Sequence, residues 1–280
     1  MADADMIPAR AIELKGRVAL VTGASREQGL GYALCQALAQ EGAIVLLTAR
    51  DGDAARRLAV RIAAGGGDEA PTHRKVEGHA LDVTDPASIA ALRETIERDR
   101  GRLDILINNA AGMSAFGEEA ASADLNAARR AMDVTLFGSW ALIEAMLPLL
   151  RRSEHGRIVN VSSGAGSHGD PMFGLGTDNS MGAGYGAAKA ALNALTHRLA
   201  HEEVAREEAG RKGSAGGPDD FPSRLRINAV CPGFTATFEG GEGMGARPPA
   251  ESAKGVLWAV RLPDDGPTGG FFRDGEPLAW

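Results

Sequence analysis

Short apolar runs alternate with segments of helical periodicity along most of this chain, and no other feature of the sequence limits its fold so strongly. The apolar runs lie at residues 17–22, 43–49, 78–83, 103–110, 157–163 and 224–233. Runs of this length without polar alternation are typical of strands buried on both faces of a parallel sheet. Helical patterns separate them at residues 30–41, 53–64, 85–101, 124–151 and 185–208. We therefore predict an α/β fold with one doubly wound parallel sheet and helices on both of its faces.

Two polar segments interrupt this alternation. Residues 210–223 predict an exposed insertion, and residues 238–251, rich in glycine and proline, lie where an open α/β sheet would place a lid. Neither segment marks a domain boundary. We expect a loose leader over residues 1–15 and a single domain over residues 16–280.

Charge and cysteine content disfavour several classes of function. The net charge of −7 argues against broad binding to nucleic acid or to an anionic membrane. The two cysteines, Cys35 and Cys231, suit a reducing compartment better than a disulfide scaffold. The amino terminus lacks a secretory signal pattern, and the apolar stretch WALIEAMLPLL is short for a membrane span. We expect a cytoplasmic protein that binds neither nucleic acid nor membrane.

The segment TGASREQGLG, residues 22–31, follows the first predicted strand and precedes the first predicted helix. A glycine-rich turn at this place can bind a pyrophosphate with its backbone N–H groups and the helix N-terminus. Its spacing departs from the G-x-G-x-x-G fingerprint, so a plain turn rich in glycine is the alternative. The position after the first strand favours a nucleotide site of the Rossmann type.

The choice of dinucleotide depends on residues near the end of the second predicted strand. A site for NAD places an acid there, whereas a site for NADP has an arginine nearby. Arg50 ends this strand, and Arg26 lies within the glycine-rich loop. Two guanidinium groups can hold a 2′-phosphate by charge-assisted hydrogen bonds, although the neighbouring Asp51 and a merely solvated strand end stay open as alternatives. We favour NADP(H) as the cofactor.

A tyrosine and a lysine lie four residues apart in the helix predicted over residues 185–208. Tyr185 and Lys189 therefore share a face, and an ammonium near a phenol lowers the pKa of that phenol. Such a pair can pass a proton to or from a substrate oxygen, but as an isolated pattern it also arises by chance. Ser162 and Ser163 end a buried strand, and because successive side chains alternate faces, only one of them should point into the cleft.

Taken together, these segments resemble the short-chain dehydrogenase/reductase (SDR) family over nearly the whole chain, from about residue 15 to residue 280. The matching segments are Thr22-Gly23 with Gly29-Leu30-Gly31, Leu81-Asp82-Val83, Asn108-Asn109-Ala110, Ser163, Tyr185-x-x-x-Lys189, Asn228 and Pro232-Gly233. Residues 262–280 resemble the tail of the carbonyl-reductase-like branch, whose members usually use NADPH.

The resemblance implies roles for the matching positions. Tyr185 would be the general acid in reduction, Lys189 would bind the nicotinamide ribose, and Ser163 would orient the carbonyl. The motifs and the resemblance together give the residues expected to hold the cofactor: Gly23, Ser25, Arg26, Gly29, Leu30, Gly31, Arg50, Asp82, Val83, Asn109, Ala110, Tyr185, Lys189, Pro232, Gly233 and Thr235.

The sequence departs from the family pattern in four places. The glycine-rich loop carries two extra residues, which predicts an outward bulge at residues 25–28. Thr135 stands where the family often has a catalytic asparagine, and Ala111 takes the glycine position of an N-N-A-G pattern. The segment between the catalytic serine and tyrosine is longer than usual, and it either borders the substrate or forms a surface loop. The residues expected to line a substrate pocket are His168, Met172, Phe173 and Phe234.

The expected function is NADPH-dependent hydride transfer between nicotinamide and a carbonyl or alcohol substrate. Two alternatives stay open: an NADP(H)-binding sensor without turnover, which Thr135 would allow, and a tailoring enzyme that dehydrates its substrate or reduces a double bond. We expect no metal, because the six histidines show no ligand spacing. The resemblance also implies a homo-oligomer, a dimer or tetramer, although some members of the branch are monomers.

Overall fold

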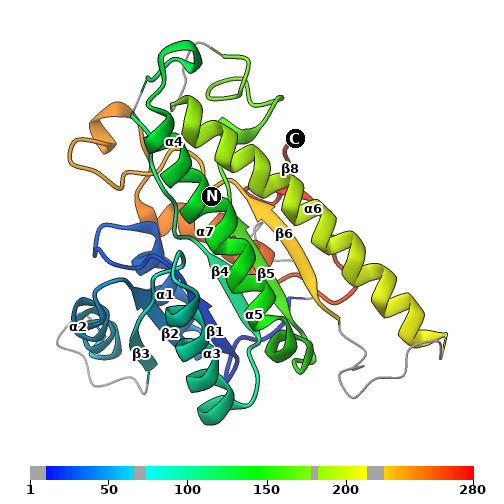
Figure 1. Ribbon diagram of the computed structural model, residues 1–280. Helices are drawn as coiled ribbons and strands as arrows, with labels where there is room; N and C mark the ends of the chain where they lie inside the picture. The colour runs from blue at the N-terminus through cyan, green and yellow to red at the C-terminus, as the bar shows by residue number, and fades with distance from the viewer. Residues whose placement is uncertain (1–10, 66–73, 116, 178–181, 213–223) are drawn as a thin grey trace.

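The computed structural model describes residues 11–65, 74–115, 117–177, 182–212 and 224–280, and among them eight strands form one sheet (Figure 1). The strands are β1 (Val18–Val21), β2 (Ile44–Ala49), β3 (Lys75–Ala80), β4 (Ile105–Asn108), β5 (Arg157–Val161), β6 (Arg226–Val230), β7 (Phe271–Arg273) and β8 (Glu276–Pro277). Their order is β3-β2-β1-β4-β5-β6-β7-β8, and every neighbouring pair is parallel except β7 and β8. β1 lies between β2 and β4, so the winding reverses there, which is where doubly wound sheets bind ligands. The predicted α/β fold is confirmed.

Helices cover both faces of the sheet (Figure 1). They are α1 (Leu30–Gln40), α2 (Gly52–Ala63), α3 (Pro86–Arg100), α4 (Leu125–Met132), α5 (Ser139–Arg151), α6 (Ala183–Arg211) and α7 (Pro249–Val260), with short turns η1 (Ala120–Ser122), η2 (Asp133–Gly138), η3 (Gly164–Gly166) and η4 (Glu242–Met244). α1, α2 and α7 pack on one face of the sheet, and α3, α5 and α6 pack on the other.

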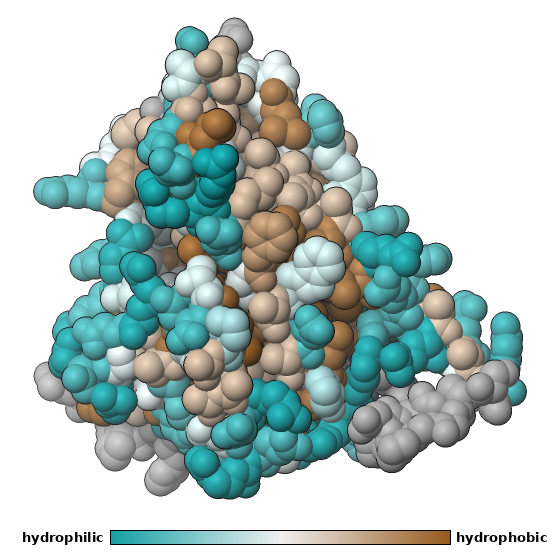
Figure 2. All heavy atoms as spheres, in the orientation of Figure 1, coloured by the Kyte–Doolittle hydropathy of each residue, from teal (hydrophilic) through white to brown (hydrophobic). Residues whose placement is uncertain are grey.

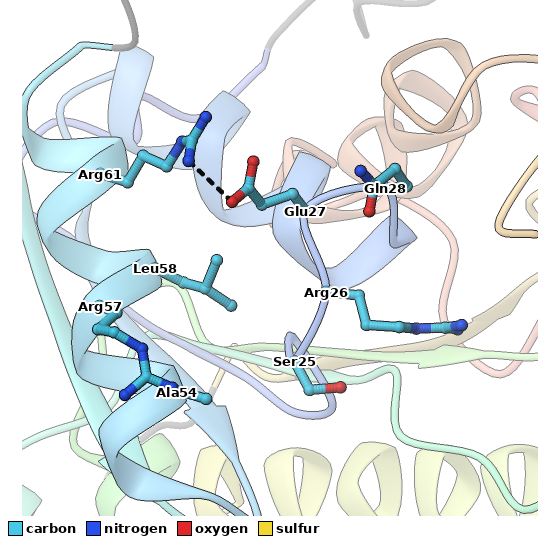
Figure 3. Close-up of a pocket in the computed structure, with 8 residues that line it drawn as sticks. All are labelled: Ser25, Arg26, Glu27, Gln28, Ala54, Arg57, Leu58 and Arg61. Carbon is cyan, nitrogen blue, oxygen red and sulfur yellow. Dashed lines mark ion pairs between the residues drawn. The ribbon is translucent and has the colours of Figure 1, made fainter.

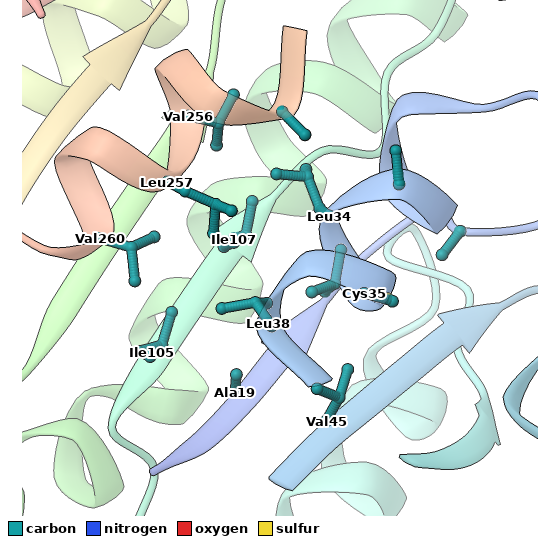
Figure 4. Packing of buried hydrophobic residues seen from close by; sticks show 14 of the residues in the cluster. Ala19, Leu34, Cys35, Leu38, Val45, Ile105, Ile107, Val256, Leu257 and Val260 are labelled. Carbon is teal, nitrogen blue, oxygen red and sulfur yellow. The ribbon is translucent and has the colours of Figure 1, made fainter. Parts of the chain in front are cut away.

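Successive side chains of β1 enter two different apolar cores. Ala19 and Val21 face α1 and α7, where Leu34 is completely buried (Figure 4). Val18 and Leu20 enter the opposite core, together with apolar side chains of α3 and α5. Because both faces of the strand are covered, no position in it favours a polar side chain, and this explains the continuous apolar run.

The third strand begins earlier than its apolar run predicts. β3 pairs with β2 over Lys75–Ala80, whereas the apolar run covers residues 78–83. β3 is an edge strand with partly exposed side chains, so Lys75 and Glu77 can take part in the pairing. Residues 82–83 consequently lie beyond the strand, in the loop that leads to α3.

The helix expected over residues 124–151 is continuous but includes one π-helical turn, η2, between α4 and α5. Such turns are rare and are frequently found at functional sites. Gly138 ends this turn, and a Cβ atom there would lie 2.7 Å from Cγ2 of Val83. The glycine therefore allows the helix to approach the loop after β3 closely.

The combined helix over Leu125–Arg151 is long and apolar enough to cross a membrane by length and composition alone. The stretch expected to be too short for a span is thus part of a longer helix. Its side chains Leu142, Ile143 and Met146 are completely buried against the sheet, as in the core helix of a globular domain.

The carboxyl-terminal part contains elements that the apolar runs did not predict. α7 begins with Pro249 and so takes over the last residues of the predicted lid segment. β7 and β8 have three and two residues, which is too short for a recognisable apolar run. The insertion predicted over residues 210–223 lies mostly outside the described residues, and α6 continues to Arg211.

Candidate active site

The loops after β1 and β4 are joined into one unit at the carboxyl edge of the sheet. Thr22 Oγ1 accepts hydrogen bonds from the backbone N–H groups of Asn109 at 3.0 Å and Ala110 at 2.9 Å. Asn109 Nδ2 in turn donates to the backbone oxygen of Thr22 at 2.7 Å. Asn109 and Ala110, both expected near the cofactor, therefore support the glycine-rich loop directly.

The glycines of this loop permit its own packing. Gly23 has a φ of +71°, and a Cβ atom there would lie 2.8 Å from Cα of Ala110. A Cβ atom on Gly31 would lie 2.7 Å from Asn109 Nδ2. Gly29 is the N-cap of α1 and provides no side-chain cap, so N–H groups of the first turn are available to an anion. Leu30 is buried in the core, which leaves only its backbone for a ligand.

The two extra residues of the loop form the expected outward bulge. Residues 25–28 are exposed and lie beside α2, where Glu27 forms an ion pair of 3.0 Å with Arg61. The side chains of Ser25 and Arg26 point away from α2 (Figure 3). The loop and α2 line a cavity of about 460 Å³. The ion pair between Glu27 and Arg61 thus attaches the bulge to α2, and the Arg26 side chain lies on the side of the bulge that faces away from α2.

Asp51, next to Arg50, caps α2. Its carboxylate accepts hydrogen bonds from the N–H groups of Asp53 at 2.9 Å and Ala54 at 3.1 Å. The bond from Ala54 is the largest influence on the Asp51 pKa, which is lowered. Arg50 is exposed and lines a second cavity, of about 470 Å³, together with Val83 and residues of α3, α4, η2 and α5. Asp51 therefore uses Oδ1 to cap α2.

Asp82 lies at the start of the loop after β3, next to the same cavity. Its carboxylate accepts hydrogen bonds from the Thr84 hydroxyl at 2.7 Å and the Thr84 N–H at 2.9 Å. These bonds, the hydroxyl bond first, lower the pKa of Asp82. Asp82 therefore shapes the loop by holding Thr84.

The predicted catalytic side chains come together where β5 ends and α6 begins. The Ser163 hydroxyl lies near the Tyr185 phenol and acts to lower the pKa of that phenol. Lys189 is only 2% exposed, and its Nζ lies 5.6 Å from the centre of the Tyr185 ring. Ser162 points elsewhere, because its hydroxyl donates to Oδ1 of Asn193 at 2.5 Å. Of the two adjacent serines, Ser163 is the one beside the tyrosine.

Burial dominates the electrostatics of this group. It raises the pKa of Tyr185 to about 12, although the neighbouring Ser163 hydroxyl acts in the opposite direction. Burial also lowers the pKa of Lys189 to about 8. Lys189 Nζ donates to the backbone oxygen of Val161 at 2.6 Å. Burial of the phenol outweighs the effect of the neighbouring groups, so the Tyr185 pKa lies above its ordinary value. The effect of Lys189 on this pKa stays a prediction.

Thr135, at the position of the family's asparagine, is completely buried in the π-helical turn. Its hydroxyl oxygen accepts a hydrogen bond from the backbone N–H of Gly112 at 3.0 Å. The side chain therefore joins the helix to the loop after β4.

Ser114 is a site residue that the sequence did not indicate. Its hydroxyl oxygen accepts a hydrogen bond from the backbone N–H of Tyr185 at 3.1 Å, 71 residues away along the chain. The contact holds the first turn of α6 against the loop after β4. No motif surrounds Ser114, so sequence reasoning had no signal with which to find it.

Two of the four predicted pocket residues belong to an aromatic group. The rings of Phe173 and Phe234 lie 5.6 Å apart, and Phe238 lies 6.3 Å beyond Phe234. Met172 precedes Phe173 and is 56% exposed. His168 is placed differently: its side chain is exposed, and its backbone N–H donates to the terminal residue Trp280 at 2.7 Å. The structure does not bring His168 to the aromatic group, because the carboxyl-terminal residues hold its backbone.

The loop after β6 carries Pro232, Gly233 and Thr235, and an arginine beyond it fixes its shape. Arg247 Nε donates to the backbone oxygen of Pro232 at 2.9 Å, and its guanidinium pairs with Asp274 at 2.8 Å. A Cβ atom on Gly233, whose φ is +74°, would lie 2.7 Å from Arg247 Nη2. The predicted lid segment is thus anchored to this loop near its carboxyl end.

Among the described residues, no group of three or more histidine, cysteine, aspartate or glutamate side chains could hold a metal ion. His197 and His201 lie four residues apart in α6. Nδ1 of His197 forms a hydrogen bond of 3.1 Å with the backbone oxygen of Gly269.

Comparison with known proteins places this geometry in a family. The chain matches the model of short chain dehydrogenases over residues 17–242. It is 30% identical to salutaridine reductase of Papaver bracteatum, over 95% of this chain and 96% of the relative. It is 31% identical to the 3-oxoacyl-acyl-carrier-protein reductase FabG of Escherichia coli, over 81% of this chain and 76% of the relative. The solved RhlG/NADP active-site complex of Pseudomonas aeruginosa is similar with a TM-score of 0.73 at 26% identity, covering 96% and 98% of the two chains.

The doubly wound sheet and the residues at its carboxyl edge define an oxidoreductase of the dinucleotide-binding class. The chain belongs to the short-chain dehydrogenase/reductase family, as its motifs predicted.

Proposed function

We propose that this protein is an NADP(H)-dependent oxidoreductase that interconverts a carbonyl compound and the corresponding alcohol. The observation that supports this most is the juxtaposition of Ser163, Tyr185 and Lys189, with the Lys189 ammonium 5.6 Å from the centre of the tyrosine ring and buried. An acid, an orienting hydroxyl and a cation at one strand end are the groups needed to protonate a carbonyl oxygen during reduction.

The residues present fit a dinucleotide phosphate. The N-terminus of α1 has no side-chain cap, and the glycines hold the loop before it in a shape that a Cβ atom would disrupt. Arg26 lies in this loop, and Arg50 lies at the end of β2. Both side chains are exposed, and both would bind the 2′-phosphate. The remaining contacts would come from Gly23, Ser25, Asp82, Val83, Asn109, Ala110, Pro232, Gly233 and Thr235. When bound, NADPH supplies the hydride.

The protein's own chemistry is then the transfer of one proton. With a pKa of about 12, the Tyr185 phenol is protonated at neutral pH and can donate to the carbonyl oxygen. As the carbonyl carbon accepts the hydride, the carbon–oxygen π bond breaks and the phenol proton moves to that oxygen. Ser163 would hold the oxygen by a hydrogen bond, and Lys189 would stabilise the phenolate that remains.

The substrate side of the site would be apolar. Met172, Phe173 and Phe234 come from the loop after η3 and from the loop after β6, and Phe238 extends the group. We propose that they contact the part of the substrate away from its carbonyl.

We also propose a homo-oligomer that pairs through the helix over Leu125–Arg151 and through α6. Large apolar side chains on this helix are exposed: Leu125, Phe137 and Trp140. Figure 2 shows apolar side chains gathered on the face over which α5 and α6 run in Figure 1. Apolar patches of this kind commonly mark an interface.

The test is NADPH oxidation with a panel of ketones, aldehydes and quinones, followed by the loss of absorbance of reduced nicotinamide, with NADH run in parallel. Tyr185→Phe should lower kcat by about a hundredfold to ten-thousandfold while NADPH still binds. Tyr32→Phe is the matched control, because Tyr32 is the only other tyrosine and lies in the core. Full activity in Tyr185→Phe would contradict the proposed role. Saturable NADPH binding without turnover on any substrate would favour a sensor.

A further inference from the structure

Arg273, on the short strand β7, lies where three segments of the chain meet. Its guanidinium forms an ion pair with Asp170, which belongs to the loop after η3. The same guanidinium donates to Sγ of Cys231, at the end of β6, at 3.1 Å from Nη2 and 3.4 Å from Nε. The Asp170 side chain is completely buried, whereas Arg273 retains 30% exposure. A buried carboxylate needs such a partner, because leaving it unpaired is strongly destabilising.

These contacts reach the backbone next to the catalytic serine. Cys231 Sγ, besides accepting from Arg273, accepts a hydrogen bond from the N–H of Gly164 at 3.2 Å. A Cβ atom on Gly164 would lie 2.2 Å from Oδ2 of Asp170 and 2.7 Å from Nη2 of Arg273. Because position 164 has no side chain, the ion pair lies directly against the backbone that follows Ser163.

The second oxygen of Asp170 shapes the substrate side. Oδ1 accepts hydrogen bonds from the backbone N–H groups of Met172 at 2.9 Å and Phe173 at 2.8 Å. The turn that results presents the Phe173 ring to Phe234, 5.6 Å away. A single guanidinium is therefore connected to the backbone of the catalytic serine on one side and to the aromatic group on the other.

We propose that Arg273 is a positioning residue that fixes the Ser163 hydroxyl and the Phe173 ring relative to each other, acting through Asp170 and Cys231. Its planar fork of donors serves both acceptors at once, which a lysine ammonium cannot reproduce. Arg273 thereby sets the distance between the reacting oxygen and the apolar part of the substrate. This inference rests on the proposed function for its catalytic consequence, but the arrangement of the loop can be tested without turnover.

The kinetic test compares two substrates that differ in one apolar group, 1-phenyl-1,2-propanedione and 2,3-butanedione. Arg273→Gln and Arg273→Lys should lower kcat/KM for the phenyl compound by about tenfold to a hundredfold, and for the smaller diketone by much less. NADPH affinity should not change. Arg261→Ala is the matched control: its ion pair with Glu41 joins the carboxyl ends of α1 and α7, near the amino end of β5 and not the carboxyl end that Ser163 follows. An equal loss for both diketones in the Arg273 variants would overturn the specificity role.

Hydrogen exchange of the peptide over residues 163–177 supplies a readout that does not depend on activity. Exchange there should be faster in Arg273→Gln than in wild type or Arg261→Ala, while the glycine-rich loop is unchanged. Wild-type exchange of this peptide in Arg273→Gln would overturn the inference, whether or not the protein turns over a diketone. If exchange accelerates but the wild type oxidises no NADPH, the positioning of the loop stands and the proposed reaction fails. Arg273→Lys serves the same measurement if the glutamine variant does not fold.

Discussion

The nucleotide side and the substrate side of this site are held in shape by different means. The glycine-rich loop is shaped by backbone geometry: Gly23 packs on Ala110, and Asn109 bonds to Thr22. On the substrate side, an arginine side chain holds the loop after η3. Arg273 reaches Asp170 across 103 residues of chain.

This difference separates the loop expected to bind the cofactor from the loops expected to select the substrate. A loop packed through glycines tolerates few substitutions, because a side chain at the close contacts would collide with its neighbours. A loop held by an ion pair can change its shape when either partner changes. We therefore expect substitutions on the nucleotide side to affect NADPH binding, and substitutions on the substrate side to affect turnover and specificity.

Among the substitutions that compare loop packing with ion pairs, the largest effect is expected on the nucleotide side. Gly23→Ala places a Cβ atom 2.8 Å from Ala110 Cα at a φ of +71°. We expect NADPH affinity to fall by about tenfold or more, measured by quenching of nucleotide fluorescence. Gly101→Ala is the matched control, because Gly101 has a φ of +69° with nothing within 4 Å of its Cβ position. If Gly23→Ala and Gly101→Ala bind NADPH with equal affinity, backbone packing at Gly23 does not shape the nucleotide side, and the proposed difference between the two sides is wrong.

A smaller effect is expected from the ion pairs of the carboxyl-terminal part. Partial burial alone would raise the pKa of Asp264, but hydrogen bonds from His155, Arg157 and Arg224 outweigh it and lower the pKa to about 2. A carboxylate whose pKa is lower when folded stabilises the protein above its unfolded pKa, and this stability is lost as the pH falls towards the folded pKa. Asp264 should thus contribute on the order of 2 kcal/mol above about pH 4, and this should disappear towards about pH 2.

Urea denaturation across this pH range tests that contribution. In Asp264→Asn the free energy of unfolding should fall less steeply as the pH is lowered than in the wild type, because the variant lacks the carboxylate that titrates. Asp53→Asn is the control, since its pair with Arg56 is exposed and should contribute little. If the free energy of unfolding of Asp264→Asn falls with pH as steeply as that of the wild type, the ion pairs of Asp264 do not stabilise the carboxyl-terminal part.

The smallest expected effect concerns the bulge of the glycine-rich loop. Glu27 and Arg61 pair at 3.0 Å with side-chain exposures of 37% and 63%. Exposed pairs contribute about 0–1 kcal/mol, so Arg61→Ala should change thermal stability and NADPH affinity only slightly. Arg56→Ala on the same helix is the control. A loss of NADPH affinity comparable to that of Gly23→Ala would mean that a side-chain ion pair shapes the nucleotide side as well.

The sequence was most informative where the structure depends on the backbone. Buried parallel strands have a recognisable apolar run, so β1, β2, β4, β5 and β6 were predicted with boundaries close to those observed. β3, β7 and β8 were shifted or missed, because an edge strand and strands of two or three residues have no such pattern. The bulge at residues 25–28 followed from counting residues between glycines.

The contacts that hold the substrate side were not predictable in the same way. Ser114, Asp170 and Arg273 belong to no motif, and their partners lie far along the chain. The raised pKa of Tyr185 was not predictable either, because the extent of burial around Tyr185 depends on tertiary packing. Only the assembled structure shows which polar side chains converge on the serine and the tyrosine.

The most direct test of the central claim is deuterium transfer from NADPH labelled at nicotinamide C4 to a ketone or aldehyde that the protein reduces. We predict deuterium on the carbon that bears the new hydroxyl group, and transfer at least about a hundredfold slower in Tyr185→Phe although NADPH still binds. Deuterium at a carbon of a reduced double bond, or NADPH binding with no transfer to any carbonyl compound, would contradict the account.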